Sequence, residues 1–108
     1  MSAWTSSSAR ASSAVLAVGF NRRFAPLAVR LRSALAARPG PRRFTIDVNA
    51  GRLPSDHWTL DPRQGGGRIV GEACHFVDLL RFLAASPISS HQVLAMDGPT
   101  RDSVTVSL

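Results

Sequence analysis

The chain has 108 residues, and 44% of them are apolar, which is enough for a core in one domain and too little for a two-domain enzyme. All 13 basic residues are arginines, the net charge is +6, and the single cysteine, Cys74, excludes an internal disulfide. No apolar run reaches the ~18 residues that suggest a membrane span. We therefore expect a cytoplasmic protein in a reducing compartment.

The positive charge is unevenly distributed along the chain. Residues 1–46 hold eight arginines and no acid, whereas residues 47–108 hold five arginines and seven acids. Such asymmetry is one sign of a nucleic-acid binder. However, tyrosine is absent and no row of aromatic side chains offers a platform for stacked bases. A genome that favours arginine, alanine and glycine accounts for the charge as well, so nucleic acid is the least favoured partner.

The first twenty residues divide into a tail and a strand. Residues 1–14, MSAWTSSSARASSA, are rich in serine and predict a disordered tail. Their acid-free, arginine-containing composition is also typical of organelle-targeting peptides. The apolar stretch AVLAVGF at 14–20 then predicts a short buried strand.

A helix and a second strand follow. Pro26 suits the first turn of a helix because it lacks the N–H that this turn leaves free. The sequence RPGP at 38–41 ends that helix. Residues 43–50, RFTIDVNA, alternate between apolar and polar side chains, as in a half-buried strand. The helix should carry one apolar stripe, made of Leu27, Leu31, Ala34 and Leu35.

The second half predicts a long loop, a helix and a hairpin. Residues 51–67 contain two prolines and four glycines, and long loops of this kind are often functional. Residues 68–84 predict a helix, and residues 91–96 and 103–108 predict strands joined by the turn DGPTRD. The order of elements indicates an α+β (α/β) fold, with helices packed on one face of a mostly antiparallel open sheet.

Three glycines, Gly65–Gly67, stand directly before the second predicted helix. A P-loop requires a lysine after its last glycine, and this chain has no lysine. A dinucleotide fingerprint requires G-x-G-x-x-G after a strand, whereas a proline-containing loop precedes these glycines. We therefore predict no cofactor-binding residue here, and we expect the glycines to let the backbone pass close to a neighbouring segment.

Glu72 and His75 are the candidate catalytic pair. Residues three apart share a helix face, and a carboxylate beside an imidazole suits proton transfer. A histidine on a helix is more often a packed structural residue, so both interpretations stay open. We expect no metal site. A di-metal carboxylate motif needs further glutamates, and Glu72 is the only one; Cys74 and His75 are adjacent and point apart.

Several blocks occur in an order that resembles the Gfo/Idh/MocA oxidoreductases: VGFNRRFAPL, VNAG, DHWTLDP, GGGRIVGEACHFVDLLRFL and SPI. The likeness covers about residues 15–108 and is greatest to the sugar-type dehydrogenases and oxidoreductases of surface-polysaccharide pathways. Members of this family bind NAD(P) in a Rossmann domain and bind substrate in a second, mostly antiparallel domain. The resemblance implies that residues 15–108 are a partial substrate and oligomerisation domain, with the tail of a Rossmann domain at AVLAVGF.

The same resemblance assigns site residues. His75 matches the family histidine that assists proton movement at the substrate hydroxyl. The family's first aspartate falls on Gly71, so the neighbouring Glu72 is a candidate for its role. The resemblance also places four residues at the substrate site, namely Asn49, His57, Trp58 and Asp78.

The resemblance implies a fragment of an NAD(P)-dependent oxidoreductase acting on a sugar-like or cyclitol-like alcohol or ketone. The family's glycine fingerprint and its Glu-Lys-Pro block are missing, so we expect this chain to bind no NAD or NADP alone and to be inactive alone. We expect a homo-oligomer or association with a Rossmann domain, and no membrane partner. One alternative is a non-catalytic interaction domain that pairs with a full-length relative through exposed sheet edges. The other is an arginine-rich nucleic-acid binder.

Overall fold

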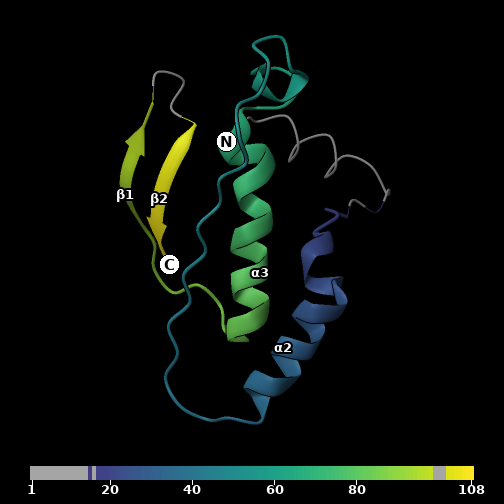
Figure 1. Cartoon of the computed structure of the whole chain (residues 1–108), viewed down its shortest axis with the longest axis vertical. Coiled ribbons are helices and arrows are strands. Elements are labelled where there is room, and N and C mark those ends of the chain that lie inside the picture. Colours follow the sequence, from purple (N-terminus) through teal and green to yellow (C-terminus); the bar gives the residue numbers. More distant parts are fainter. Residues whose placement is uncertain (1–14, 16, 99–101) are drawn as a thin grey trace.

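The computed structural model describes residues 15, 17–98 and 102–108 (Figure 1). The predicted serine-rich tail at 1–14 lies outside these residues. The elements are two short 3-10 helices, a π-helical turn, two α-helices and two strands. In chain order they are η1 (Asn21–Phe24), α2 (Pro26–Ala36), η2 (Trp58–Leu60), η3 (Ile69–Ala73), α3 (Cys74–Ala84), β1 (Gln92–Asp97) and β2 (Ser103–Ser107).

The first predicted helix is confirmed as α2, which begins at Pro26 and ends at Ala36. Arg42 covers its carboxyl end, because the guanidinium donates to the carbonyl oxygens of Leu35 and Arg38. The predicted apolar stripe is only partly used. Leu35 is half-buried, whereas Leu27 is 75% exposed. The face of α2 that packs against the remainder of the chain is therefore next to the predicted stripe and overlaps it only in part.

The second predicted helix, 68–84, is confirmed, but it is not uniform. Its first turns form the π-helix η3, and α3 continues from Cys74. Ala85 ends the helix in the left-handed region, at φ 55°, and its N–H donates to the carbonyl of Arg81. Figure 1 shows α3 at the centre of the chain, with α2 on one side and the two strands on the other.

The predicted hairpin is confirmed within one residue at its ends. β1 and β2 pair antiparallel, with Val93 opposite Val106 and Asp97 opposite Ser103. A register shift between Val93 and Ala95 interrupts the ladder. Two helices and a two-stranded antiparallel sheet are compatible with the predicted α+β class.

Two predicted strands are wrong. Residues 15 and 17–20 contain no strand, and residues 14 and 16 lie outside the described part. Residues 43–50 run extended but join no ladder. The alternation that predicted the second strand is still visible, because Phe44 and Ile46 are half-buried and their neighbours are exposed. A strand requires a backbone partner as well as an alternating pattern, and the described residues supply none to either segment.

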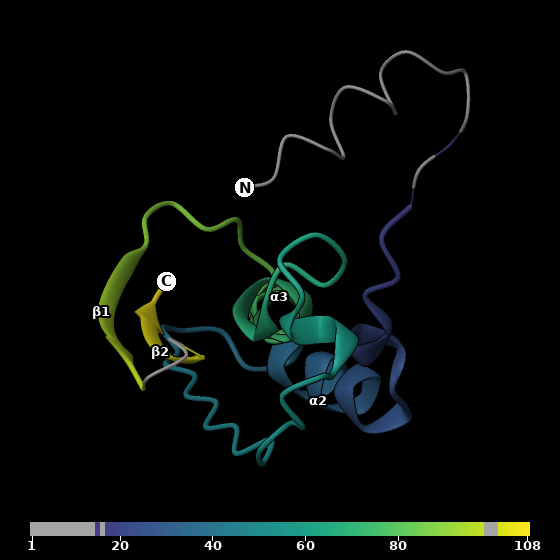
Figure 2. The ribbon, with the colours of Figure 1, turned by 90° about the horizontal axis from the view of Figure 1, so that it is seen from above.

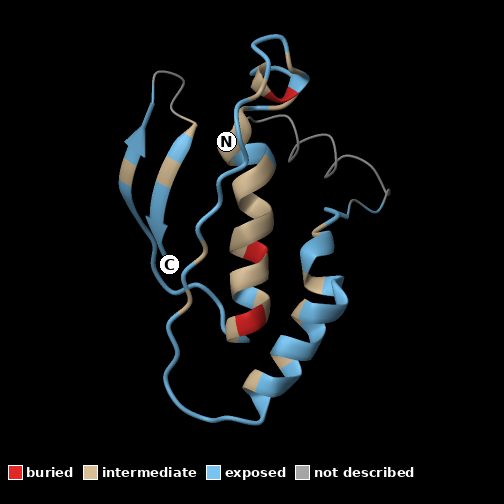
Figure 3. Cartoon of the chain, viewed as in Figure 1, coloured by how far each residue is buried: buried red, intermediate tan, exposed pale blue. Residues whose placement is uncertain are grey.

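Burial is concentrated on α3, as Figure 3 shows. Leu83 is the one apolar side chain classed as buried within the described residues, and Asp78 on the same helix is a buried polar one. Large apolar side chains elsewhere remain open to solvent, including Phe24 at 74% and Trp58 at 62%. No helix in the described part is both long and apolar enough to span a bilayer.

Gly65 is expected to be essential for the loop before η3. A Cβ at this position would lie 2.4 Å from the Thr59 backbone, and backbone atoms cannot move aside as a side-chain tip can. Gly65→Ala should therefore lower the melting temperature by on the order of 5 °C or more, measured by circular dichroism. Gly19→Ala is the matched control, since nothing lies within 4 Å of a Cβ there. Equal melting temperatures for the two variants would contradict the close approach.

Candidate functional site

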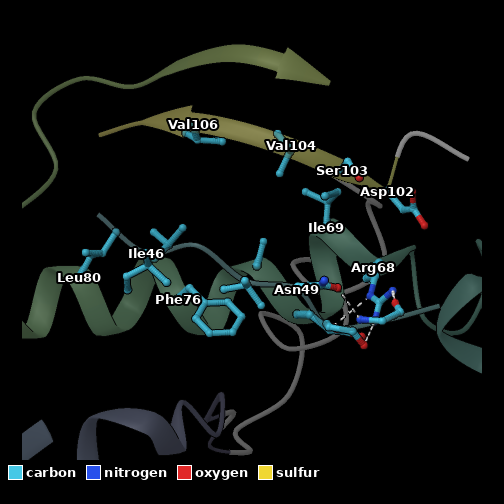
Figure 4. A pocket seen from close by; sticks show the side chains of 16 residues that line it. Ile46, Asn49, Arg68, Ile69, Phe76, Leu80, Asp102, Ser103, Val104 and Val106 are labelled. Atoms are coloured by element: carbon cyan, nitrogen blue, oxygen red, sulfur yellow. Dashed lines mark hydrogen bonds and ion pairs between the residues drawn. The ribbon is translucent and has the colours of Figure 1, made fainter. Parts of the chain in front are cut away.

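A cleft of about 480 Å³ lies between α3 and β2, and the extended segment 46–51 closes one side (Figure 4). Its walls are mostly apolar, with Phe76 and Leu80 from α3 and Val104 and Val106 from β2. An apolar cleft with a few polar groups is the usual form of a small-molecule site. The polar lining residues are Asn49, Arg68, Glu72, Asp102 and Ser103.

Arg68 organises the cleft. Its Nη1 donates to the carbonyl of Gly51 at 2.5 Å, and its Nη2 donates to the carbonyl of Ala50 at 3.0 Å. Its Nε donates to Oε2 of Glu72 at 3.2 Å. The planar guanidinium thus fixes the 50–51 backbone against the start of the helix. Arg68 was not among the predicted site residues, although its spacing of four from Glu72 was a usable signal.

The structure does not bring Glu72 and His75 together. Glu72 lines the cleft and pairs with Arg68, whereas His75 lies against Phe20. Among the described residues, no hydrogen bond joins the two candidates. The π-helical turn before Cys74 explains the difference, because its wider i→i+5 turns break the 100° spacing that predicted a common face.

His75 has an unusual environment. Its ring meets Phe20 edge-to-face, with the ring centroids 5.7 Å apart and an interplanar angle of 83°. Its Nδ1 atom is buried and has no hydrogen-bond partner in the part of the chain that the structure describes. A buried polar atom without a partner costs free energy of folding, so it requires an explanation such as a ligand or a partner group.

Asp78 is occupied by an ion pair rather than open to substrate. Nε of Arg23 donates to its Oδ2 at 2.8 Å, and Nη2 of Arg23 donates to its Oδ1. These hydrogen bonds, and then the guanidinium charge, hold the pKa of Asp78 below its ordinary value. In turn the hydrogen bond to Asp78 raises the pKa of Arg23. The pair joins η1 to α3, and Asp78 does not line the cleft.

The other predicted substrate residues separate into two places. Asn49 lines the cleft, where its Oδ1 accepts from the N–H of Gly51 at 3.1 Å. His57 lies in the loop at η2, where its Nδ1 accepts from the N–H of Thr59 at 3.3 Å. Its ring is tilted against Trp58, with centroids 5.9 Å apart. Of the six predicted residues, only Asn49 and Glu72 line the cleft.

The glycine segment does not fit the pyrophosphate of a dinucleotide. The N–H groups of Gly65 and Gly66 donate to the carbonyl of Asp61 at 2.9 and 3.0 Å, and that of Gly67 donates to the carbonyl of Thr59 at 3.0 Å. A phosphate-binding loop must present such N–H groups to its ligand. Here the N–H groups already donate to the chain's own carbonyls. The glycines therefore let this segment pass close to the backbone at Thr59.

No family model, no curated protein and no solved structure matches this chain in comparisons with known proteins. The likeness to the Gfo/Idh/MocA oxidoreductases therefore stays a prediction from the sequence blocks.

Proposed function

We propose that this chain supplies the substrate-side part of a cytoplasmic NAD(P)-dependent oxidoreductase of the Gfo/Idh/MocA type, acting on a sugar-like or cyclitol-like alcohol or ketone. One observation carries the proposal: His75 follows the glycine segment on α3 and holds a buried Nδ1 that no described residue satisfies. A group supplied by a substrate or by a joined domain would satisfy it.

His75 has the chemistry for proton transfer. A neutral imidazole accepts a proton from a hydroxyl through its free nitrogen and returns one to a carbonyl oxygen in the reverse direction. Phe20 meets the ring edge-to-face and Nδ1 is buried, so substrate reaches Nδ1 only if the groups that bury it move aside. Val18 and Gly19, which precede Phe20, are exposed, so few contacts hold this segment in place. The proposal places the nucleotide on another domain, since the N–H groups of the glycine segment already donate to the chain's own carbonyls.

A second candidate is a non-catalytic interaction domain that pairs with a full-length relative. The observation that favours it is the exposure of large apolar side chains, with Val93 at 52% and Leu94 at 57% on the hairpin. The extended segment 43–50 adds a stretch of backbone without a ladder. Exposed strand edges and apolar side chains together are typical of surfaces that join other chains.

A chimera tests the first candidate. A family member's Rossmann domain, Glu-Lys-Pro block and terminal strands are joined to residues 15–108, and NADH formation is followed with a panel of sugars and cyclitols. We expect turnover with at least one member of the panel. The isolated chain is the control and should show neither turnover nor a saturable change in NADH fluorescence.

Two results would contradict the proposal. A folded chimera that binds NADH and turns over no member of the panel would favour the interaction domain. Saturable micromolar binding of NADH by the isolated chain would show that the nucleotide site does not depend on another domain.

A further inference from the structure

The segment 43–48 has the form of a strand but no partner. Phe44 and Ile46 are half-buried, whereas Arg43, Thr45 and Asp47 are exposed. Within residues 15, 17–98 and 102–108, no hydrogen bond reaches the backbone of residues 43–48. An extended stretch with one apolar face and unpaired N–H and C=O groups is a template for a further strand.

The two edges of this segment differ. A cavity of about 770 Å³ is lined by residues 42–48 on one side and by residues 104–108 on the other, so one edge faces β2. Figure 2 shows β1, β2 and the extended segment following one another beside α3, with β1 at one end of the series and the segment at the other. The edge that faces away from β2 is therefore the place where another strand can pair.

We propose that residues 43–47 of two copies of this chain pair as antiparallel strands about a two-fold axis through Thr45. In this register Arg43 lies opposite the partner's Asp47, and Asp47 lies opposite the partner's Arg43. On the other face Phe44 lies opposite the partner's Ile46. Opposite charges and apolar pairs directly across a ladder stabilise it. Neither Arg43 nor Asp47 takes part in an ion pair among the described residues.

Charge selects this register over its nearest competitor. A ladder centred on Ile46 also keeps the apolar face together, with Phe44 opposite the partner's Val48. It places Asp47 opposite the partner's Thr45, however, and forms no charge pair. The intermediate register, shifted by one residue, would set apolar side chains opposite polar ones. The half-burial of Phe44 and Ile46 on one face excludes it. The two-fold pairing makes the interface self-complementary, as in a closed dimer.

Charge reversal tests the pairing on the whole chain by sedimentation over a concentration series. The unmodified chain should be a dimer at micromolar concentration. Arg43→Asp and Asp47→Arg each place like charges opposite one another, and each should weaken the dimer by about tenfold or more. The double variant, with both changes, should restore it. Arg63→Asp, in the exposed loop, is the matched charge control and should remain a dimer.

A disulfide test fixes the register. In a Cys74→Ser background, Thr45→Cys brings two thiols together at the two-fold axis. The two Cα atoms there should lie within the roughly 4.4–6.8 Å that a disulfide spans. Oxidised glutathione should cross-link this variant between copies and leave Ile46→Cys without a cross-link. Circular dichroism confirms that each variant is folded like the unmodified chain.

Several results would overturn the proposal: a monomer at all concentrations, single reversals that stay dimeric, a folded double variant that stays monomeric, or preferential cross-linking through Ile46→Cys. Capture of a monomeric chain by a full-length family member would assign the edge to that partner instead.

Discussion

His75→Asn lowers the kcat of the chimera described above by at least about 10²-fold if His75 transfers the proton, because a positioned acid or base contributes about 10²–10⁴-fold to the rate. Asparagine keeps a polar group of similar size but cannot exchange a proton near neutral pH. The measurement is steady-state kcat and KM with the best substrate from the panel. The fold is checked by circular dichroism.

Two variants serve as comparisons for His75→Asn. His57→Asn should cost much less, since Nδ1 of His57 already accepts from the N–H of Thr59, whereas Nδ1 of His75 has no partner among the described residues. Glu72→Gln tests the other catalytic candidate, whose carboxylate lines the cleft beside Arg68. A large loss of kcat gives Glu72 a role in the reaction. A change confined to stability shows that Glu72 only holds Arg68 in place. If His75→Asn stays within a few-fold of the unmodified chimera, His75 is a structural residue.

Asp78→Asn is expected to lower the melting temperature by on the order of 5 °C or more, since it removes the charge from a hydrogen-bonded pair that joins η1 to α3. Asp78 is 5% exposed, so water replaces Arg23 poorly. Arg23→Gln should have a similar effect, and the double variant should lose little more than either one. Asp56→Asn, an exposed carboxylate in the loop, is the control and should melt like the unmodified chain.

The same pair predicts how stability depends on pH. Because Arg23 holds the pKa of Asp78 below its ordinary 3.8, the folded chain releases this proton more readily than the unfolded chain. The stabilisation is therefore fully present above about pH 5 and is lost as the pH falls below 4 toward the folded pKa. Melting temperatures measured from pH 7 to pH 3 should fall more steeply for the unmodified chain than for Asp78→Asn. Parallel curves would show that the pair does not stabilise the fold.

The sequence by itself determined the elements that depend on neighbours along the chain. Pro26 and the RPGP stretch marked both ends of α2, and hydrophobic periodicity predicted the helix at 68–84. The turn DGPTRD between two alternating stretches predicted the hairpin. These signals act over a few residues, through backbone dihedrals and the spacing of side chains, so they can be read without the fold.

Only the tertiary structure decided the features that join distant segments. The alternation at 43–50 predicted a strand, but its partner is not a local property. Asp78 was predicted at the substrate site, and its partner proved to be Arg23, 55 residues earlier. The spacing of Glu72 and His75 predicted one face, and a π-helical turn placed them apart. Ion pairs, ladders and irregular turns depend on which segments pack together, and no single window of sequence contains that information.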